Sequence, residues 1–300
     1  LISNLYGVVD GIGSNFLKKY LNISSSKWFI FNNDSNFNDI EIFKKKIENE
    51  KFFLAIGGGF IQDIGKFLQY KTKKKCICLP TALSTHVYGS SHITNHKIFD
   101  LDISSTSIKA NYAYATWIDY CFLTLIDQIN PHLMKNGISD VYALKSATEE
   151  WEISPAFNAT KSDLATLFLS KYSISLLHKC VDNKCIESLV LAQALLNLIT
   201  EIKGSAPASG TEHLYANVME NKFLSSEPHG VLVAKGILFQ NALISDEKIK
   251  QAEKEMKKLG IFPYSNYEST NYYLDKDIRF EMKKLSKVKK RFSYLELIND

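Results

Sequence analysis

The hydrophobic pattern of the chain changes near residue 130. Before that point, short apolar runs alternate with stretches in which apolar residues recur every three or four positions. The short runs predict strands, and the wider spacing predicts amphipathic helices. Strands are expected at 28–31, 52–56 and 75–79, helices at 12–20, 40–49 and 60–68, and a short strand or arm at the beginning. This alternation predicts an α/β domain with a parallel sheet and right-handed crossovers.

Beyond Asn130-Pro131, helical spacing dominates. Six long helices are expected, at 140–153, 162–178, 186–203, 211–223, 230–244 and 246–259. The segment 81–127 is rich in Ser, Thr, Asn and Tyr, which predicts irregular structure that includes a hairpin. We therefore predict an α/β domain over residues 1–130 and a helical domain over residues 131–300.

Composition narrows the range of functions. A chain of 300 residues that is 45% hydrophobic and 23% charged has the composition of a globular protein with room for two cores. Its net charge of +4 is spread out and does not form the basic stripe of a nucleic-acid groove. No apolar run has the length of a membrane span, and the N-terminus lacks a signal pattern. Five cysteines, an odd number, do not suggest a disulfide framework, so we expect a cytoplasmic protein.

The stretch from Phe52 to Tyr70 carries the first sign of chemistry. A predicted strand runs into Gly57, Gly58 and Gly59, and a predicted helix follows. The free N–H groups at the start of that helix attract anions, and glycines let an anion approach closely. A dinucleotide pyrophosphate is the expected guest, although a tight turn alone also favours glycine.

Three further residues suggest a metal site. Asp140 is expected to open the first helix of the second domain, His213 lies in the first turn of a later helix, and His229 opens the next. One carboxylate and two imidazoles can bind a catalytic divalent cation and leave one of its coordination positions open for water or substrate. Each residue also has a simpler explanation, because Asp140 can serve as a helix cap and single histidines often lie on a surface or in a core.

Several segments resemble motifs of one enzyme superfamily, in the same order along the chain. GGGFIQDIGKF resembles the cofactor turn GGG-x-x-x-D-x-x-K, and PTALSTHVYGS resembles a PT-x-x-S strand end that lies along the dinucleotide. GISDVYALKSATEEW is similar to the helix that carries a metal-binding Asp, ASGTEHLYANVME contains Ala-Ser-Gly-x-Glu-His, and RFSYLELI resembles a closing helix. By these motifs the chain resembles the dehydroquinate synthase-like and iron-containing alcohol dehydrogenase superfamily, and within it the sn-glycerol-1-phosphate dehydrogenases.

The resemblance implies a dehydroquinate synthase-like fold: a Rossmann-like α/β N-terminal domain with a parallel sheet, an all-α C-terminal domain, and an active site in the cleft between them. It implies NAD(P)(H) as cofactor and Zn²⁺, Ni²⁺ or Fe²⁺ as metal. The residues implied for the cofactor are Gly57, Gly58, Gly59, Asp63, Thr81, Ser84 and Ser90. Those implied for the metal and for catalysis are Asp140, His213 and His229.

The implied reaction is reduction of a small phosphorylated ketone, such as dihydroxyacetone phosphate, to a polyol phosphate such as sn-glycerol 1-phosphate. The metal would bind the carbonyl oxygen, and the cofactor would supply the hydride. His86, Asp140, Lys145 and Asn217 are the expected substrate contacts. Lys145 lies one position later than the family's usual lysine and is about equally well explained as a solvent-facing helix residue.

The chain departs from the family pattern around substrate and adenosine recognition. His86 stands where an Asp is common, Val87 and Ser139 replace glycines, and Asn217 replaces a substrate-contacting His. The segment 32–50 is also short, since the family fits a further helix and strand before the glycine turn. The substrate can therefore be another phosphorylated or polyhydroxylated ketone.

Two alternatives remain beside this oxidoreductase. One is a cyclising lyase of the dehydroquinate synthase type, and the other is a degenerate relative without turnover. The expected partners are a small phosphorylated ketone or polyol and further copies of the chain in a homo-oligomer, a dimer in the simplest case, with no nucleic acid and no membrane span.

Overall fold

The computed structural model describes residues 6–11, 13–14, 27–32, 34–94, 97–99, 107–261, 276–289 and 292–297. The chain divides into two compact units, Leu1–Pro131 and His132–Asp300. The helix expected at 12–20 falls almost entirely outside the described residues.

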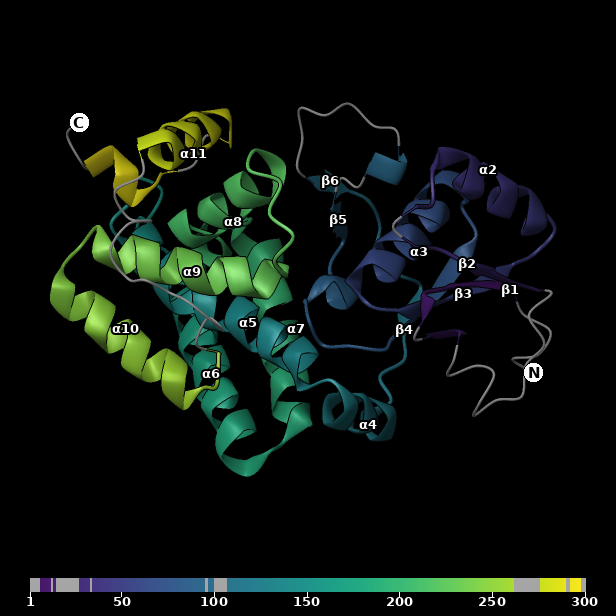
Figure 1. Cartoon of the computed structure of the whole chain (residues 1–300), viewed down its shortest axis with the longest axis horizontal. Coiled ribbons are helices and arrows are strands. Elements are labelled where there is room, and N and C mark those ends of the chain that lie inside the picture. The colour runs from purple at the N-terminus through teal and green to yellow at the C-terminus, as the bar shows by residue number, and fades with distance from the viewer. Residues whose placement is uncertain are drawn as a thin grey trace. The chain divides into compact units, whose positions relative to one another are not determined.

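A five-stranded parallel sheet forms the first unit (Figure 1). Its order is β2-β1-β3-β4-β7, and every neighbouring pair is parallel. The strands are β1 (Tyr6–Val9), β2 (Trp28–Ile30), β3 (Phe52–Gly57), β4 (Lys75–Pro80) and β7 (Ala115–Thr116). The expected parallel α/β architecture is thus confirmed.

Side chains of the central strands alternate between two apolar layers, as the period of two in a strand requires. Phe53 and Ala55 of β3 face the larger layer, which contains buried residues of α2 (Phe37–Lys46) and α3 (Gly59–Thr72). Leu54 and Ile56 face the smaller layer on the other side of the sheet. Both helices therefore cover the same face of the sheet, as Figure 1 shows.

The strand expected at the beginning of the chain is present as β1 (Tyr6–Val9), which pairs with both β2 and β3. Between β2 and β3, α2 is the one helix or strand among the described residues, which agrees with the short segment 32–50.

The described residues of the segment expected to be irregular contain several regular elements. β5 (His92–Thr94) and β6 (Ser107–Lys109) pair in the antiparallel direction, which confirms the expected hairpin, and the short 3-10 turns η3 (Val87–Gly89) and η4 (Lys97–Phe99) lie nearby. The helix α4 (Tyr120–Ile129) was not expected. Asp119 caps it by accepting a hydrogen bond from Phe122 N at 2.9 Å, the role for which Asp is favoured at helix starts.

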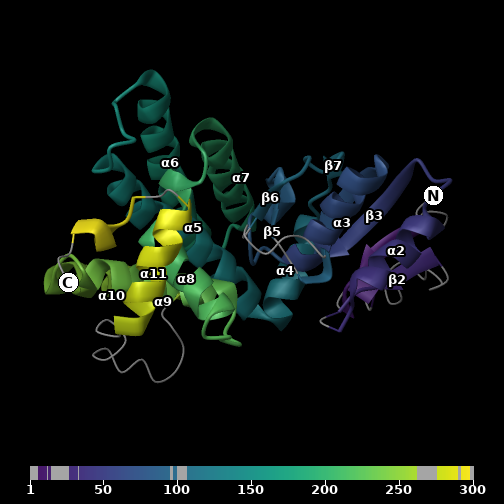
Figure 2. The ribbon, with the colours of Figure 1, turned by 90° about the horizontal axis from the view of Figure 1, so that it is seen from above.

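The second unit is helical (Figures 1 and 2). Its elements are α5 (Pro131–Glu152), α6 (Lys161–Asn183), α7 (Ile186–Lys203), η5 (Ala206–Ala208), α8 (Thr211–Asn221), α9 (His229–Ala242), α10 (Asp246–Lys258), α11 (Lys276–Lys289) and η7 (Tyr294–Leu297). α6 packs along α7, and α8 packs along α9. Within the described residues, none of the helices combines the length and the apolar composition that crossing a bilayer needs.

The helix α5 links the other helices of this unit. Gln240 of α9 donates to Ser146 O at 3.0 Å, and Tyr142 OH donates to Glu255 of α10 at 2.6 Å. Most residues of α5 from Gly137 to Trp151 are buried. The middle of α5 is therefore hydrogen-bonded to both α9 and α10.

Candidate metal centre and glycine turn

Three side chains of the second unit converge on one position. Asp140 comes from the middle of α5, His213 from the first turn of α8, and His229 from the start of α9. Each offers one ligand atom, and the three atoms lie within 4.8 Å of one another. Asp140 and His213 are 2% and 8% exposed, and His229 is half-buried. An aspartate and two histidines suit a divalent cation that keeps open coordination positions.

A glutamate of α8 holds each imidazole. Glu212 Oε1 lies 2.8 Å from His213 Nδ1, and Glu220 Oε1 lies 2.7 Å from His229 Nδ1. Because an ionised carboxylate only accepts hydrogen bonds, each Nδ1 is the donor. Nε2 of each ring is then left for a metal, and His213 Nε2 lies 3.2 Å from Asp140 Oδ1. Carboxylate partners of this kind orient metal-binding imidazoles and raise their basicity.

The charge of His213 depends on these neighbours. Burial by itself lowers the pKa of His213, but the hydrogen bonds with Asp140 and Glu212 outweigh burial and raise the pKa to about 9. Without a metal, the imidazole is therefore charged at neutral pH. A divalent cation has to displace this proton, so its binding releases a proton and becomes tighter as the pH rises towards 9.

A second buried carboxylate supports the start of α8. Glu150 of α5 accepts hydrogen bonds from Thr211 N at 2.7 Å, from the Thr211 hydroxyl at 2.5 Å and from Tyr294 N. Glu212 Oε1 accepts from Gly210 N at 2.7 Å. A Cβ at Gly210 would collide with carboxylate oxygens of both Glu150 and Glu212. Glycine is therefore the residue that lets two carboxylates approach this turn.

Glu150 has a raised pKa for a glutamate. Burial and the charge of Glu212 raise the pKa of Glu150 to about 7, although the hydrogen bonds from Thr211 and Tyr294 lower it. At neutral pH, Glu150 is thus close to half-protonated.

The position of Asp140 corrects an expectation. It does not open a helix, because α5 begins at Pro131. Proline suits the first turn of a helix, and Gly137, three residues before Asp140, lies buried inside α5. Ser139 is also helical, and its hydroxyl donates to Lys135 O at 3.1 Å. The explanation of Asp140 as a helix cap is therefore wrong.

The glycine turn has the expected form. Gly57 ends β3, Gly58 precedes α3, and Gly59 begins it. A Cβ at Gly57 would meet Ile61 at 2.6 Å, whereas a Cβ at Gly58 would meet nothing nearer than Asp10 Oδ2, at 3.9 Å. The fold itself does not need glycine at 58. The binding of a phosphate at the start of this helix stays a prediction.

Asp10 joins this turn although its sequence position did not single it out. Its Oδ1 accepts from Gly13 N at 2.7 Å, and its Oδ2 accepts from Gly58 N at 2.8 Å. An available signal was an aspartate directly after an apolar strand and just before Gly11 and Gly13. Asp10 ties the end of β1 to the glycine turn.

Asp63 is buried rather than open to a ligand. It is 1% exposed, and its carboxylate lies 3.1 Å from Lys66 Nζ and accepts from Thr94 N at 3.1 Å. Lys66 Nζ also donates to the backbone carbonyls of Val87 at 2.8 Å and His92 at 2.6 Å. This arrangement favours a role in positioning the loop and β5, and direct contact of Asp63 with a dinucleotide stays a prediction.

The remaining expected cofactor residues follow β4. Thr81 is buried beside the glycine turn, where its N–H donates to Gly57 O at 3.0 Å. Ser84 and His86 are half-buried in the following loop. Ser90 is buried, and its hydroxyl accepts from His92 N at 3.0 Å. The roles of these residues towards cofactor and substrate stay predictions.

The expected substrate residues of the second unit do not lie together. Asn217 follows His213 by one turn of α8, and its amide donates to His213 O at 2.6 Å. Lys145 lies five residues after Asp140, which places it roughly 140° around α5 from that carboxylate. Asn217 thus lies on α8, the same helix as the candidate ligand His213. Lys145 shares α5 with Asp140 but lies on a different side of that helix.

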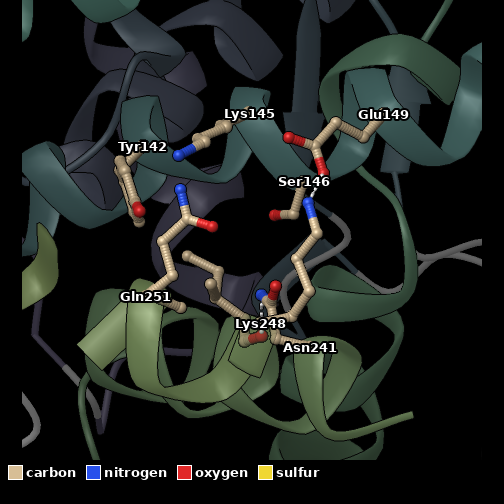
Figure 3. A pocket seen from close by; sticks show the side chains of 9 residues that line it. Tyr142, Lys145, Ser146, Glu149, Asn241, Lys248 and Gln251 are labelled. Carbon is tan, nitrogen blue, oxygen red and sulfur yellow. Dashed lines mark hydrogen bonds and ion pairs between the residues drawn. The ribbon is translucent and has the colours of Figure 1, made fainter. Parts of the chain in front are cut away.

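Lys145 instead lines a hollow between α5, α9 and α10. Figure 3 shows Tyr142, Lys145 and Glu149 of α5 opposite Lys248 and Gln251 of α10. Lys145 Nζ is 2.6 Å from Glu255 Oε2, and Lys248 Nζ is 3.5 Å from Glu149 Oε2. A phosphate at Lys145 would have to compete with the first of these pairs.

Comparison with known proteins gives this geometry a context. Residues 11–124 match the sequence model of the family described as iron-containing alcohol dehydrogenase. A glycerol-1-phosphate dehydrogenase (NAD(P)+) of Sulfurisphaera tokodaii is 30% identical over 217 residues, which are 69% of this chain and 59% of that protein. The chain spans 59% to 60% of the length of three such dehydrogenases.

Solved structures share the fold. A protein described as a probable glycerol dehydrogenase from Sinorhizobium meliloti 1021 matches with a TM-score of 0.68 at 15% identity, over 99% of this chain and 86% of that chain. A 2-epi-5-epi-valiolone synthase from Streptomyces hygroscopicus, solved with NAD+ and Zn2+ bound, matches with a TM-score of 0.59 at 12% identity, over 94% and 80%. At these identities the likeness shows a common fold, which confirms the expected fold class.

Proposed function

From a chain that resembles iron-containing alcohol dehydrogenases in sequence and in fold, we propose a metal-dependent NAD(P)H oxidoreductase. Its substrate is a small phosphorylated ketone such as dihydroxyacetone phosphate, and its product is a polyol phosphate such as sn-glycerol 1-phosphate. The similarity to glycerol-1-phosphate dehydrogenases supports this substrate class. The proposal also includes a cytoplasmic location.

The observation that carries the proposal is the convergence of Asp140, His213 and His229. They come from three different helices, and their ligand atoms lie within 4.8 Å of one another. Glu212 and Glu220 each hold one imidazole through its Nδ1, as carboxylates commonly do behind metal-binding histidines. When bound there, Zn²⁺, Fe²⁺ or Ni²⁺ would act as a Lewis acid towards a ketone oxygen.

The residues of this chain have separate tasks in such a reaction. The N–H groups at the start of α3 bind the dinucleotide pyrophosphate, and the space beside Gly58 admits it. Asp140, His213 and His229 hold the cation, and Glu212 fixes the ring of His213. The dinucleotide supplies the hydride.

Substrate selection is assigned to polar groups that differ from the family pattern. His86 and Asn217 hydrogen-bond the hydroxyl or phosphate groups of the ketone. Asn217 uses one of its two amide hydrogens on His213 O, so its other N–H and its amide oxygen remain to bind the substrate.

The direct test is oxidation of NADH or NADPH by the full chain with dihydroxyacetone phosphate and Zn²⁺. We expect turnover that a chelator stops and that His213→Ala abolishes together with metal retention. Lys145→Met serves as a comparison, because Lys145 lies away from Asp140 in α5. Stoichiometric metal in His213→Ala would remove that residue from the ligand set.

The same assay distinguishes the alternatives. Phosphate release without net loss of NADH would indicate a cyclising lyase of the dehydroquinate synthase type. Binding of NADH without turnover of any phosphorylated ketone, with metal bound, would indicate a relative that has lost catalysis. Either result would reject the proposed reduction.

A further inference from the structure

Two lysine-rich segments of the first unit meet at one edge of the parallel sheet. Residues 45–51 lead into β3, and residues 70–75 lead from the end of α3 into β4. Phe52 and Lys75 are partners in the pairing of these strands, and Lys75 N donates to Lys51 O at 3.0 Å. The two segments therefore form one continuous surface at the amino ends of β3 and β4, which we name the amino-edge patch.

The amino-edge patch carries more net positive charge than the whole chain. Its two segments contain seven lysines and two glutamates, a net charge of +5, against +4 for all 300 residues. The rest of the chain therefore has a net charge of −1. Charge that looks spread out along the sequence is thus concentrated where the fold brings two segments together. Six of the seven lysines are exposed: Lys45, Lys46, Lys51, Lys71, Lys73 and Lys75.

Aromatic rings lie among these lysines. Lys75 Nζ is 4.1 Å from the centroid of the Tyr114 ring and 5.3 Å from that of Phe52, and the two rings meet edge to face. Lys73 Nζ is 4.9 Å from the centroid of the Tyr70 ring. Tyr70 and Tyr114 are 38% and 55% exposed. Cation–π contacts thus hold ammonium groups beside exposed tyrosines, and the patch presents charge and amphipathic rings on one surface.

The amino-edge patch lies at the other end of the strands from the glycine turn. The sheet is parallel, so the amino ends of its strands share one edge and the carboxyl ends share the opposite edge. β3 begins at Phe52 beside the patch and ends at Gly57, and a strand of this length spans roughly 16 Å. A partner at the patch therefore does not compete with a dinucleotide at the glycine turn.

We propose that the amino-edge patch binds the surface of a membrane that contains anionic phospholipids. The negative potential of such a surface attracts lysines, and tyrosine, with an apolar ring and a polar tip, suits the headgroup region. This contact is peripheral and needs no membrane span.

The arrangement of the rings favours lipid over nucleic acid as the anionic partner. A single-stranded nucleic acid binds by stacking its bases on the faces of aromatic rings. In the patch, lysine ammonium groups already lie over the rings of Phe52, Tyr70 and Tyr114. The phosphates of a lipid surface need only the ammonium groups, which point charges of this kind bind without stacking.

Sedimentation of the full chain with vesicles tests the proposal. The probe is a vesicle of equal parts of phosphatidylglycerol and phosphatidylcholine, and a vesicle of phosphatidylcholine alone is the neutral comparison. We expect the chain to sediment with the anionic vesicle and not with the neutral one. The binding should weaken as salt is added, because the Debye length falls from about 30 Å at 0.01 M to about 10 Å at 0.1 M.

A triple variant, Lys71→Gln, Lys73→Gln and Lys75→Gln, removes charge from the patch. It keeps Lys74, whose Nζ donates to Glu48 O at 2.5 Å and ties the two segments together. Each lysine at an anionic surface contributes a factor of about five to the binding constant. The triple variant should therefore bind the anionic vesicle about a hundredfold more weakly than the unmodified chain.

Three exposed lysines of α10 provide the matched control. Replacing Lys250, Lys254 and Lys258 by Gln removes the same charge from the second unit. This control should sediment with the anionic vesicle as the unmodified chain does, because its substitutions lie outside the patch.

Circular dichroism checks that each variant keeps its helices. If the first triple variant loses them, Lys45→Gln, Lys46→Gln and Lys51→Gln together test the same patch from its other segment. Four results would each overturn the proposal: no sedimentation with the anionic vesicle, equal sedimentation with the neutral vesicle, equal weakening in the α10 control, or tighter binding to a single-stranded RNA than to the anionic vesicle.

Discussion

Glu212 is expected to touch neither metal nor substrate, yet it sets the orientation of His213. Its Oε1 is shared between His213 Nδ1 and the N–H of Gly210. The side chain is fully buried, so water does not compete for these bonds. At the scale of the residue, the metal centre therefore depends on groups behind the three ligands.

Replacing Glu212 tests this dependence. We expect Glu212→Gln to weaken Zn²⁺ binding by about 10–100-fold, because a neutral amide orients the imidazole less firmly and lowers its basicity. Competition with a chromogenic chelator measures the affinity without any need for activity. Glu255→Gln is the control, since that carboxylate pairs with Lys145 instead. An affinity unchanged in Glu212→Gln would contradict the positioning role.

Glu150 predicts a specific dependence of stability on pH. Its pKa is about 7 in the folded chain against an ordinary value of 4.5, so the folded state binds this proton more tightly. The stabilisation is complete below pH 4.5 and is lost as the pH rises through 7. The shift is equivalent to about 3 kcal/mol.

Glu150→Gln should remove that dependence. With a chelator present, urea unfolding at several pH values between about 4.5 and 8 gives the free energy of unfolding. The loss of stability on raising the pH should be about 3 kcal/mol smaller in Glu150→Gln than in the unmodified chain. Parallel pH curves for the two proteins would rule out Glu150 as the titrating group.

At the scale of elements, α3 connects the glycine turn to the loop that follows β4. Lys66 is fully buried and holds backbone carbonyls of that loop, while Asp63 holds the N–H of Thr94. The helix thereby holds the loop at Val87 and Ser90. The ion pair between Asp63 and Lys66 of α3 thus binds both the loop after β4 and the strand β5.

Lys66→Met tests this connection. We expect a loss of about 3–5 kcal/mol in the free energy of unfolding, because Asp63 is left as a buried charge without its cation. Adding Asp63→Asn should recover part of that loss. Lys71→Met is the matched control on the same helix, since Lys71 is exposed. Equal stability of Lys66→Met and Lys71→Met would show that the buried pair has no such role.

The elements also show what the sequence could predict. Strands β3 and β4 and the helix between them followed directly from buried apolar runs and the glycines, and α7 has the expected bounds of 186–203. The wrong predictions concern positions where the same sequence pattern is compatible with two structures. The helix expected to begin at residue 140 begins at Pro131 and continues through Gly137, because tertiary packing outweighs the low helix propensity of glycine.

The candidate site could be predicted in part for a similar reason. Asp140, His213 and His229 were identified by residue type and by the resemblance, and their proximity agrees with that hypothesis. Glu150 and Glu220 could not be found, because their partners lie in other turns and elements and leave no local pattern. The sequence did not show that Lys145 points towards Glu255, because that depends on how α5 is rotated relative to α10.

At the scale of the whole molecule, the two units are expected to respond to different ligands. The glycine turn lies in the unit Leu1–Pro131, and the metal cluster lies in the unit His132–Asp300. A ligand at about 100 times its dissociation constant stabilises the unit that binds it by about 2.7 kcal/mol. Dinucleotide and metal should therefore act on separate parts of the unfolding curve.

Differential scanning calorimetry with two variants tests this separation. Asp140→Asn should abolish the shift caused by Zn²⁺ and keep the shift caused by NADH. Gly58→Val should do the reverse, since its fold has room for a side chain at 58 but a phosphate does not then fit. A single transition that both ligands shift equally in both variants would refute independent binding units.

The outer strands of the parallel sheet have a consequence for the behaviour of the protein at high concentration. β2 has three residues and β7 has two, whereas the central β3 and β4 have six each. So short a border offers few backbone groups on which a foreign strand can grow, and this limits fibril formation and stacking between sheets.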